Sequence, residues 1–220
     1  GAIITVSLKN ETLITPNVEY YMIENTTVGY LYMETFSNTL AQQVEDALKE
    51  LEQQGLTSLI IDLRDNTGGY LTAATDVASI FLKRGSRIYS LDYQGEVTNY
   101  NDKTSEHKEY NIVVLTNGNT ASAAEILAAA LKESYGATIV GETSFGKGKV
   151  QQTMQLDDGS MVKYTSALWL TPNGTCIDGR GITPDYSISN EEQKDENGNI
   201  TGISDLQLNK AIEILNGITN

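Results

Sequence analysis

Two residues of this sequence can serve as a nucleophile and its base. Ser122 stands in a run of small residues, 121–124, where a substrate can approach a hydroxyl closely. A serine hydroxyl is a weak nucleophile and needs a neighbouring base. Lys147 lies between Gly146 and Gly148, and a lysine desolvated in such a turn gives up its proton more readily than one in water. The pair predicts acyl transfer by a serine.

A plainer interpretation exists for each of these residues. A serine that follows a strand and begins a helix is often only a helix cap. A lysine in a glycine turn is often only a surface residue. The amides of Asn66-Thr67-Gly68-Gly69 can point into a cavity and form an oxyanion hole, but a simple turn has the same sequence.

Other catalytic chemistries find little support in the residues. His107, the single histidine, lies in the polar stretch 101–109, and Cys176 is the single cysteine, which excludes an internal disulfide and two-cysteine zinc sites. Asp62, Asp65 and Glu125 lack His or Cys at ligand spacing. We therefore expect no metal and no cofactor.

A phosphate-binding loop is likewise not favoured. Residues 141–147 match its pattern until Gly148, where a Ser or Thr and a helix should follow.

The composition of the sequence excludes several classes of protein. The 220 residues carry 15 Lys and Arg against 29 Asp and Glu, a net charge of −14, and no apolar run approaches the length of a membrane helix. The negative field repels phosphate backbones and anionic lipids, so nucleic acid is not an expected partner. The beginning of the sequence shows no signal peptide, and any signal or anchor is expected outside this fragment.

Apolar patterning predicts an α/β protein with a parallel sheet. Two strand-loop-helix units, 56–83 and 111–133, place the loops 66–69 and 117–122 at the carboxyl ends of strands, where ligands of such sheets usually bind. Further strands are expected at 3–8, 19–23, 28–35, 137–141, 150–156 and 161–169, the last two as a hairpin. Further helices are expected at 39–54 and 205–215, the last with Ser204 as its cap.

Four segments together resemble the carboxyl-terminal processing, or tail-specific, proteases, which are serine-lysine peptidases. They are IIDLRDNTGG (60–69), NGNTASAAEILAAALKE (117–133), GETSFGKGKVQQ (141–152) and LTPNGTCIDGRGITPD (170–185). The resemblance implies a crotonase-like or ClpP-like β-β-α core with flanking antiparallel strands. It predicts one peptidase domain over 1–220: leading strands at 1–27, a catalytic core at 28–188, a polar loop at 189–201 and a terminal helix at 202–220.

The resemblance also implies roles for individual residues. Ser122 corresponds to the nucleophile and Lys147 to the general base, with Gln151, or else Glu133, as the residue that positions the lysine. The oxyanion donors would be the amides of Ala123 and of Gly68 or Gly69. Thr67 stands where the family commonly has proline, and Asn119-Thr120 replaces its usual small, serine-rich lead-in.

The expected partners follow from the same resemblance. They are polypeptides with unstructured tails and a PDZ domain elsewhere in the parent chain. A homo-oligomer is allowed, and the location is extracytoplasmic, in the cell envelope or secreted. Two alternatives use the same fold: a non-catalytic ligand- or peptide-binding module, and acyl-thioester chemistry on paired glycine amides. Neither needs a serine and a lysine at this spacing.

Overall fold

A mostly parallel sheet forms the centre of the molecule, because its strands are apolar on both faces. β3 is buried along its whole length, and β6 is buried after its first residue. The computed structural model describes residues 15–218, so the strand predicted at 3–8 lies outside the described residues. In order across the sheet the strands are β1 (Val18–Met22), β2 (Val28–Met33), β3 (Ser58–Asp62), β6 (Asn111–Thr116), β7 (Thr138–Gly141) and β10 (Tyr186–Ser187).

The strand directions place the loops that matter at one edge. β1 runs antiparallel to β2, and every other neighbouring pair is parallel. The loops that leave β2, β3, β6 and β7 therefore all emerge at the carboxyl edge of the sheet. This edge carries Ser122 and Lys147.

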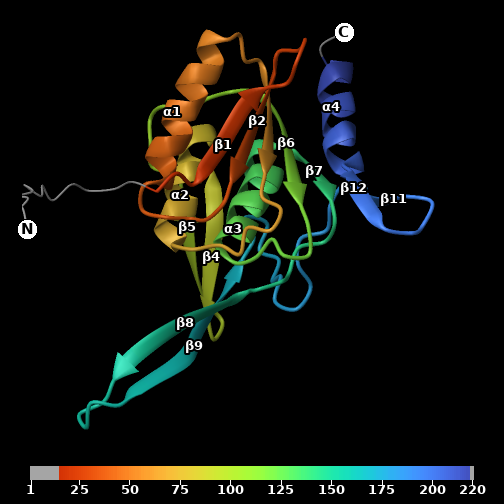
Figure 1. Cartoon of the computed structure of the whole chain (residues 1–220). Coiled ribbons are helices and arrows are strands. Elements are labelled where there is room, and N and C mark those ends of the chain that lie inside the picture. The colour runs from red at the N-terminus through yellow and green to blue at the C-terminus, as the bar shows by residue number, and fades with distance from the viewer. Residues whose placement is uncertain (1–14, 219–220) are drawn as a thin grey trace, which may run out of the picture.

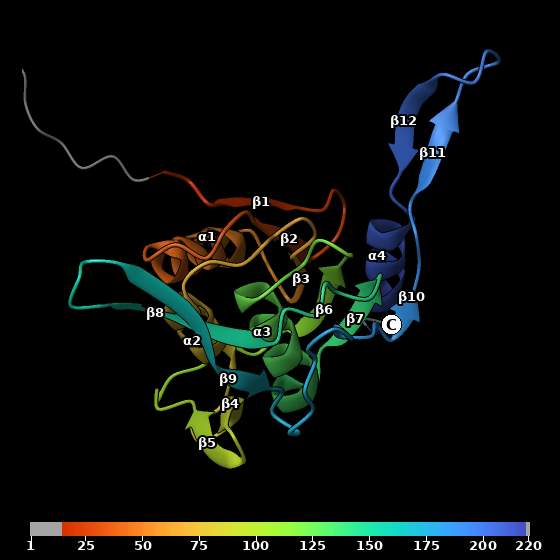
Figure 2. The same cartoon turned by 90° about the horizontal axis from the view of Figure 1, so that it is seen from below.

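Helices cover both faces of the sheet (Figures 1 and 2). Successive strand residues alternate between the faces, so Leu59 and Ile61 pack in the larger core with three helices, whereas Ile60 packs in a smaller core with the fourth. The helices of the larger core are α1 (Leu40–Gln53), α2 (Leu71–Phe81) and α3 (Ala123–Ala130), and α4 (Leu206–Ile218) covers the opposite face. None of the helices within 15–218 is long and apolar enough to cross a membrane.

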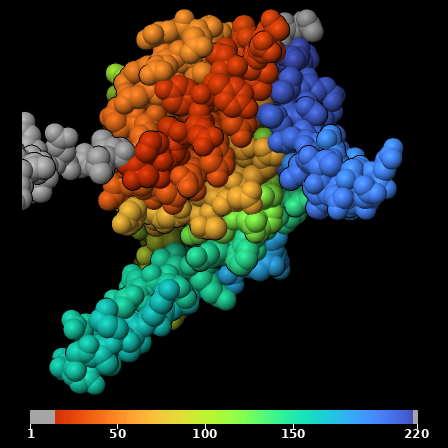
Figure 3. Space-filling view, in the orientation of Figure 1, coloured from red at the N-terminus to blue at the C-terminus, as the bar shows by residue number. Residues whose placement is uncertain are grey.

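A second, antiparallel sheet extends from the body. Its strand order is β5-β4-β9-β8, and the β8–β9 hairpin projects away from the main sheet (Figures 1 and 3). The strands are β4 (Arg87–Tyr93), β5 (Glu96–Asn101), β8 (Lys149–Gln155) and β9 (Met161–Leu170). Lys147 thus lies at the root of this hairpin.

The predicted α/β class with flanking antiparallel strands is confirmed, and the differences are local. The helix expected over 121–133 begins at Ala123 and continues from Ala130 into a π-helical turn, η1 (Leu131–Tyr135). Residues 189–201 form most of a hairpin, β11 (Glu191–Lys194) and β12 (Ile200–Ser204), where a polar loop was expected. The strands β4 and β5 were not predicted.

The expected cap of the last helix was wrong by one residue. The Leu208 amide donates to Asp205 Oδ1 at 2.9 Å, so Asp205 is the N-terminal cap of α4, while Ser204 ends β12. A carboxylate at this position also faces the positive end of the helix dipole.

Replacing Leu48 by alanine should lower the free energy of unfolding by about 2–5 kcal/mol. Leu48 is buried against the sheet in α1, and the deletion leaves a cavity there. Urea denaturation measures the loss. Lys49→Ala is the matched control, because Lys49 is exposed and forms only a surface ion pair with Asp46. Equal losses in the two variants would contradict this assignment of the core face of α1.

Candidate active site

Three loops at the carboxyl edge of the sheet are bonded to one another. The loop after β6 is joined to the loop after β3, because the Ala121 amide donates to the Asn66 carbonyl oxygen at 2.9 Å. The Thr120 hydroxyl donates to the Leu63 carbonyl oxygen at 2.8 Å. The Phe145 amide, in the loop after β7, donates to the Thr120 carbonyl oxygen at 2.9 Å. The three segments that carry the predicted site residues therefore meet.

Ser122 occupies a strained backbone conformation between β6 and α3. Its φ is 58° and its ψ is −120°, a region that a residue with a Cβ rarely adopts, and such strain persists where the surroundings enforce it. A serine on a sharp strand-to-helix turn presents its hydroxyl outward, as in nucleophile elbows. Ser122 and Glu125 have the spacing of a capping box, but the Glu125 amide donates to the Ser122 carbonyl oxygen at 2.9 Å, and the Ser122 hydroxyl makes no cap hydrogen bond.

A buried carboxylate joins the loop that carries Ser122 (117–122, the serine loop) to the loop that carries Lys147 (142–148, the lysine loop). Glu125 is 0% exposed and lies in the first turn of α3. Its Oε2 accepts hydrogen bonds from the amides of Ser122 (2.8 Å) and Lys147 (2.9 Å). Its Oε1 accepts from the Ser144 hydroxyl (2.6 Å) and the Gly146 amide (2.7 Å). Four donors satisfy this charge, as a buried carboxylate requires.

The shared oxygen brings Ser122 and Lys147 together. Their backbone nitrogens bind the same atom of Glu125, so the two nitrogens lie less than about 6 Å apart. The Lys147 side chain, however, is exposed, and the desolvated lysine that the sequence suggested does not appear in the described structure. Gly146 and Gly148 are buried, but a glycine has no side chain that could cover Lys147 between them.

The lysine loop is fixed on its outer side by the turn 177–181. The Ile182 amide donates to the Ser144 hydroxyl at 2.7 Å, and the Gly179 amide donates to the Gly146 carbonyl oxygen at 2.9 Å. A Cβ on Gly181, whose φ is +70°, would lie 2.1 Å from the Ser144 carbonyl oxygen. Only glycine permits this approach. Trp169 of β9 adds a hydrogen bond from its indole Nε1 to the Lys147 carbonyl oxygen at 2.8 Å.

The predicted oxyanion donors follow Ser122 in the chain or belong to the loop after β3, and they differ in availability. A Cβ built on Gly68 would come within 2.9 Å of the Ser122 Cβ, so this backbone directly faces the serine. The Gly68 amide already donates to Asn66 Oδ1 at 2.8 Å. The amides of Gly69 and Ala123 donate to no other residue within 15–218. These two amides are therefore the pair free to bind an anion.

The two candidates for the third catalytic residue lie in different places. Gln151 is an exposed residue of β8, in the same segment as Lys147. Glu133 lies in η1 and accepts a hydrogen bond from the Asn173 amide at 2.7 Å. Eleven residues of helical chain separate Glu133 from Ser122, about 16 Å at ~1.5 Å per residue. Gln151 and Glu133 both remain candidates for the residue that positions the lysine.

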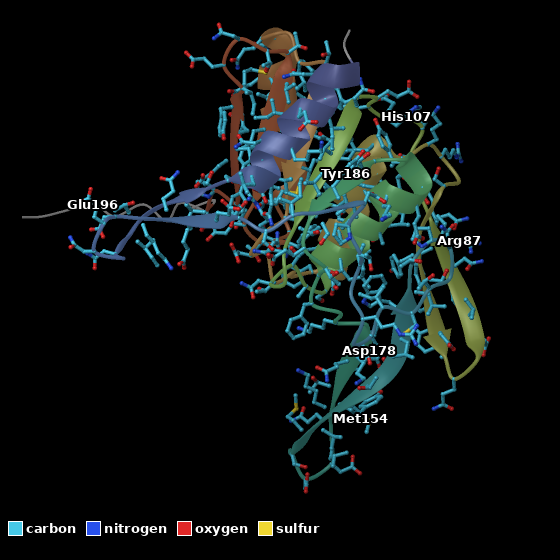
Figure 4. The ribbon with its side chains drawn as sticks, turned by 90° about the vertical axis from the view of Figure 1, so that its right-hand side faces the viewer. Arg87, His107, Met154, Asp178, Tyr186 and Glu196 are labelled. Carbon is cyan, nitrogen blue, oxygen red and sulfur yellow. The ribbon has the colours of Figure 1, made fainter. Side chains whose placement is uncertain are left out.

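His107 lies at the other end of the sheet. It precedes β6, whereas Ser122 follows β6, and its ring contacts Glu109 at 3.2 Å. Figure 4 shows His107 far from Asp178, which belongs to the turn beside the lysine loop. Across residues 15–218, no group of three or more His, Cys, Asp or Glu side chains could hold a metal ion.

The sequence profile of peptidase family S41 matches residues 27–188, which contain all three loops. The chain belongs to peptidase family S41. It is 40% identical over 182 residues to the carboxy-terminal processing protease CtpA of Bacillus subtilis, covering 82% of this chain and 39% of that protein. It is 36% identical over 187 residues to a probable CtpA-like serine protease of Staphylococcus epidermidis, covering 84% and 38%.

Solved S41 structures share the fold. The photosystem II D1 C-terminal processing protease aligns with a TM-score of 0.73 and 32% identity, over 80% of this chain and 49% of that one. A putative peptidase from Parabacteroides merdae aligns with a TM-score of 0.72 at 21% identity, over 92% and 65%, which shows the fold alone. The S41 chain described here spans about two fifths of the length of the relatives it matches in sequence.

Sequence reasoning missed the role of Glu125. Glu125 was considered only as a metal ligand, and Ser144 was not singled out. The signal that could have found Glu125 is its position three residues after Ser122, the Ser-x-x-Glu spacing of a capping box. The contact from Ser144 joins segments 19 residues apart, and no local pattern reveals it.

Glu125→Gln should reduce catalysis on the order of 100-fold and destabilise the fold by about 1–3 kcal/mol. The amide keeps the shape of the carboxylate, but its NH₂ group faces amide donors and leaves some of them unpaired. Peptide-cleavage kinetics and urea denaturation measure the two effects. Glu52→Gln is the matched control, since it is the same substitution on a carboxylate of α1 that accepts hydrogen bonds from Lys108 and Tyr110. A Glu125 variant as active as the control would disprove the role of Glu125.

Proposed function

We propose that this S41 chain is a serine endopeptidase that cleaves unstructured or carboxyl-terminal tails of proteins with a Ser122–Lys147 dyad. The observation that carries the proposal is the binding of both residues' amides to one oxygen of Glu125. This contact holds the backbones of the two residues close together, which supports their acting as a pair. The names of the relatives, a carboxy-terminal processing protease and a C-terminal processing protease, supply the reaction class.

The reaction follows from the groups at the edge of the sheet. Neutral Lys147 Nζ accepts the proton of Ser122 Oγ as this oxygen attacks the scissile carbonyl carbon. The resulting oxyanion binds the free amides of Gly69 and Ala123. The Lys147 ammonium then gives its proton to the leaving amine as the C–N bond breaks. Water, deprotonated by Lys147, hydrolyses the acyl-serine ester and restores both residues.

Because Lys147 is exposed, we propose that the bound substrate removes water from its amine. A polypeptide lying over the exposed Lys147 and Phe145 displaces water from the ammonium group and thereby favours its neutral form. We propose that an extended chain does this, because unstructured tails are the proposed substrates. Gln151, in the strand that follows the loop, is proposed to orient the Lys147 amine.

The remaining parts of the proposal concern the parent protein. Polypeptides with unstructured tails are the proposed partners, and a PDZ domain is proposed for the parent chain. An extracytoplasmic location is part of the same proposal.

Ser122→Ala and Lys147→Ala should each lower the cleavage rate by at least about 1000-fold, because the two residues act as a unit. Neither residue lies in the core, so both variants should keep the melting temperature of the wild type. Mass spectrometry of an unfolded protein incubated with each variant measures cleavage. Lys149→Ala is the control, since Lys149 is exposed, two residues away, and bonded to Asp178. Near-normal cleavage by either dyad variant refutes the dyad, and peptide binding without cleavage by the wild type would favour a binding module.

The cleavage rate of the wild type should increase with pH. A lysine base works only after it has lost its proton, so the active fraction grows as the solution becomes more alkaline. Initial rates on one unfolded substrate, with stability checked at each pH, give the profile. A rate independent of pH from neutral to alkaline solution would exclude a lysine base.

A further inference from the structure

Arg64 opens the loop that carries the glycine amides, and its guanidinium is held from two sides. Nε and Nη2 donate to the carboxylate of Asp62, at the end of β3. Nη1 donates to Asp205 Oδ1 at 2.8 Å and to Gln207 Oε1 at 3.0 Å. The Arg64 side chain is 14% exposed, so burial alone would lower its pKa, but its hydrogen bonds to Asp62 and Asp205 raise the pKa above the ordinary value. The guanidinium is therefore charged throughout the neutral range.

The partners of Nη1 come from the carboxyl-terminal segment. Asp205 caps α4 by accepting the Leu208 amide, and burial, which would raise its pKa, is outweighed by the hydrogen bond from Arg64, so the pKa is lowered. Gln207 is buried, and its Nε2 donates to the Ile188 carbonyl oxygen at 2.8 Å. Both residues lie beyond residue 188, where the S41 match ends.

The guanidinium is held by hydrogen bonds and also borders an open space. Arg64 borders a cavity of about 500 Å³ that is also lined by Asp62, Asp65, Asn117 and Gln207. A side chain beside such a space has room to turn once its partners are removed. The contacts from Asp205 and Gln207 are therefore the restraint on its outer end.

Loop 64–69 connects this restraint to the serine. The Asp65 amide donates to Asn117 Oδ1 at 3.0 Å, and the Asn66 side chain donates to the Met33 carbonyl oxygen at 2.7 Å. From there the loop reaches Gly68, whose backbone faces Ser122, and Gly69, whose backbone lies against Phe36. Arg64 and the Gly69 amide are thus the two ends of one short segment, and hydrogen bonds to Asn117, Met33 and Phe36 also hold the residues between them.

We propose that Asp205 and Gln207 are positioning residues of the active site, which hold Arg64 and through it keep the Gly69 amide directed at the oxyanion. The inference rests on the proposed function, since this amide has an oxyanion to bind only if Ser122 attacks a carbonyl. It assigns a role in catalysis to the start of α4, on the face of the sheet opposite α1, α2 and α3.

Asp205→Ser tests the proposal in the full chain. Serine keeps the helix cap, but its hydroxyl is too short to reach Nη1. Adding Gln207→Met removes the second acceptor at similar volume, and Asp205→Asn restores a neutral acceptor. Glu213→Ser is the matched control on the same helix, because Glu213 pairs with Lys210 and does not contact Arg64.

Amide hydrogen exchange of the peptide spanning 64–70 is the first readout, since it needs no catalysis. Exchange should accelerate in Asp205→Ser, more so in the double variant, and less in Asp205→Asn, with Glu213→Ser equal to the wild type. Unchanged exchange in the double variant overturns the proposal. Acceleration across the whole chain also overturns it, because that result means general destabilisation.

Cleavage kinetics of a peptide substrate are the second readout. Asp205→Ser should lower kcat roughly 10-fold with KM unchanged, a part of the 10²–10³ that a lost oxyanion donor costs. Asp205→Asn should recover part of the loss. Normal kcat in an active double variant overturns the positioning role. If the wild type itself does not cleave while the loop exchange still responds, the proposed function fails and the structural restraint on the loop stands.

Discussion

The rest of the site depends on one buried carboxylate. Glu125 is surrounded by protein, carries no cationic partner among the described residues, and is satisfied by three backbone amides and one hydroxyl. The donors come from two loops, the one before α3 and the one after β7, which are also joined by the bond from the Phe145 amide to the Thr120 carbonyl oxygen. A charge buried in this way forces its donors to stay, because leaving it unpaired costs several kcal/mol. The free-energy cost of leaving the Glu125 carboxylate without its donors therefore maintains the geometry of the site.

The parallel sheet supplies the other half of the arrangement. Since β3, β6 and β7 run in the same direction, the loops that follow them lie at the same edge of the sheet. The close approach of Gly68 to Ser122, and of Gly181 to the lysine loop, then leaves no space for side chains between backbones. These two glycines, the most flexible type of residue, therefore occupy tightly packed positions in the fold.

Much of this architecture could be predicted from the sequence. The apolar runs at 56–63 and 111–116 were sufficient to predict a parallel sheet and the two loops at its carboxyl edge, because these signals are local. The assignment of Ser122 as the nucleophile stays a prediction. The strand β5 was missed because its polar, exposed residues, 96–101, lack the alternation of a half-buried strand. The strand β4 is mostly buried, and its short run of residues 88–91 was not recognised as a strand. The sequence did not show that Lys147 is exposed. Its flanking glycines are buried by backbone that lies 30 residues downstream, and this contact does not cover the lysine side chain.

The distance along the chain between Arg64 and its partners has a consequence for synthesis. Asp205 and Gln207 follow Arg64 by 141 and 143 residues and lie at the start of α4, which packs against β3, β6 and β7. A chain growing from its N-terminus can form β3, β6 and the serine loop well before this last helix emerges. Until then the apolar face with Ile60 and Val113 is uncovered and Arg64 lacks its outer partners. The order of translation itself therefore delays completion of the site until the domain that contains it is whole.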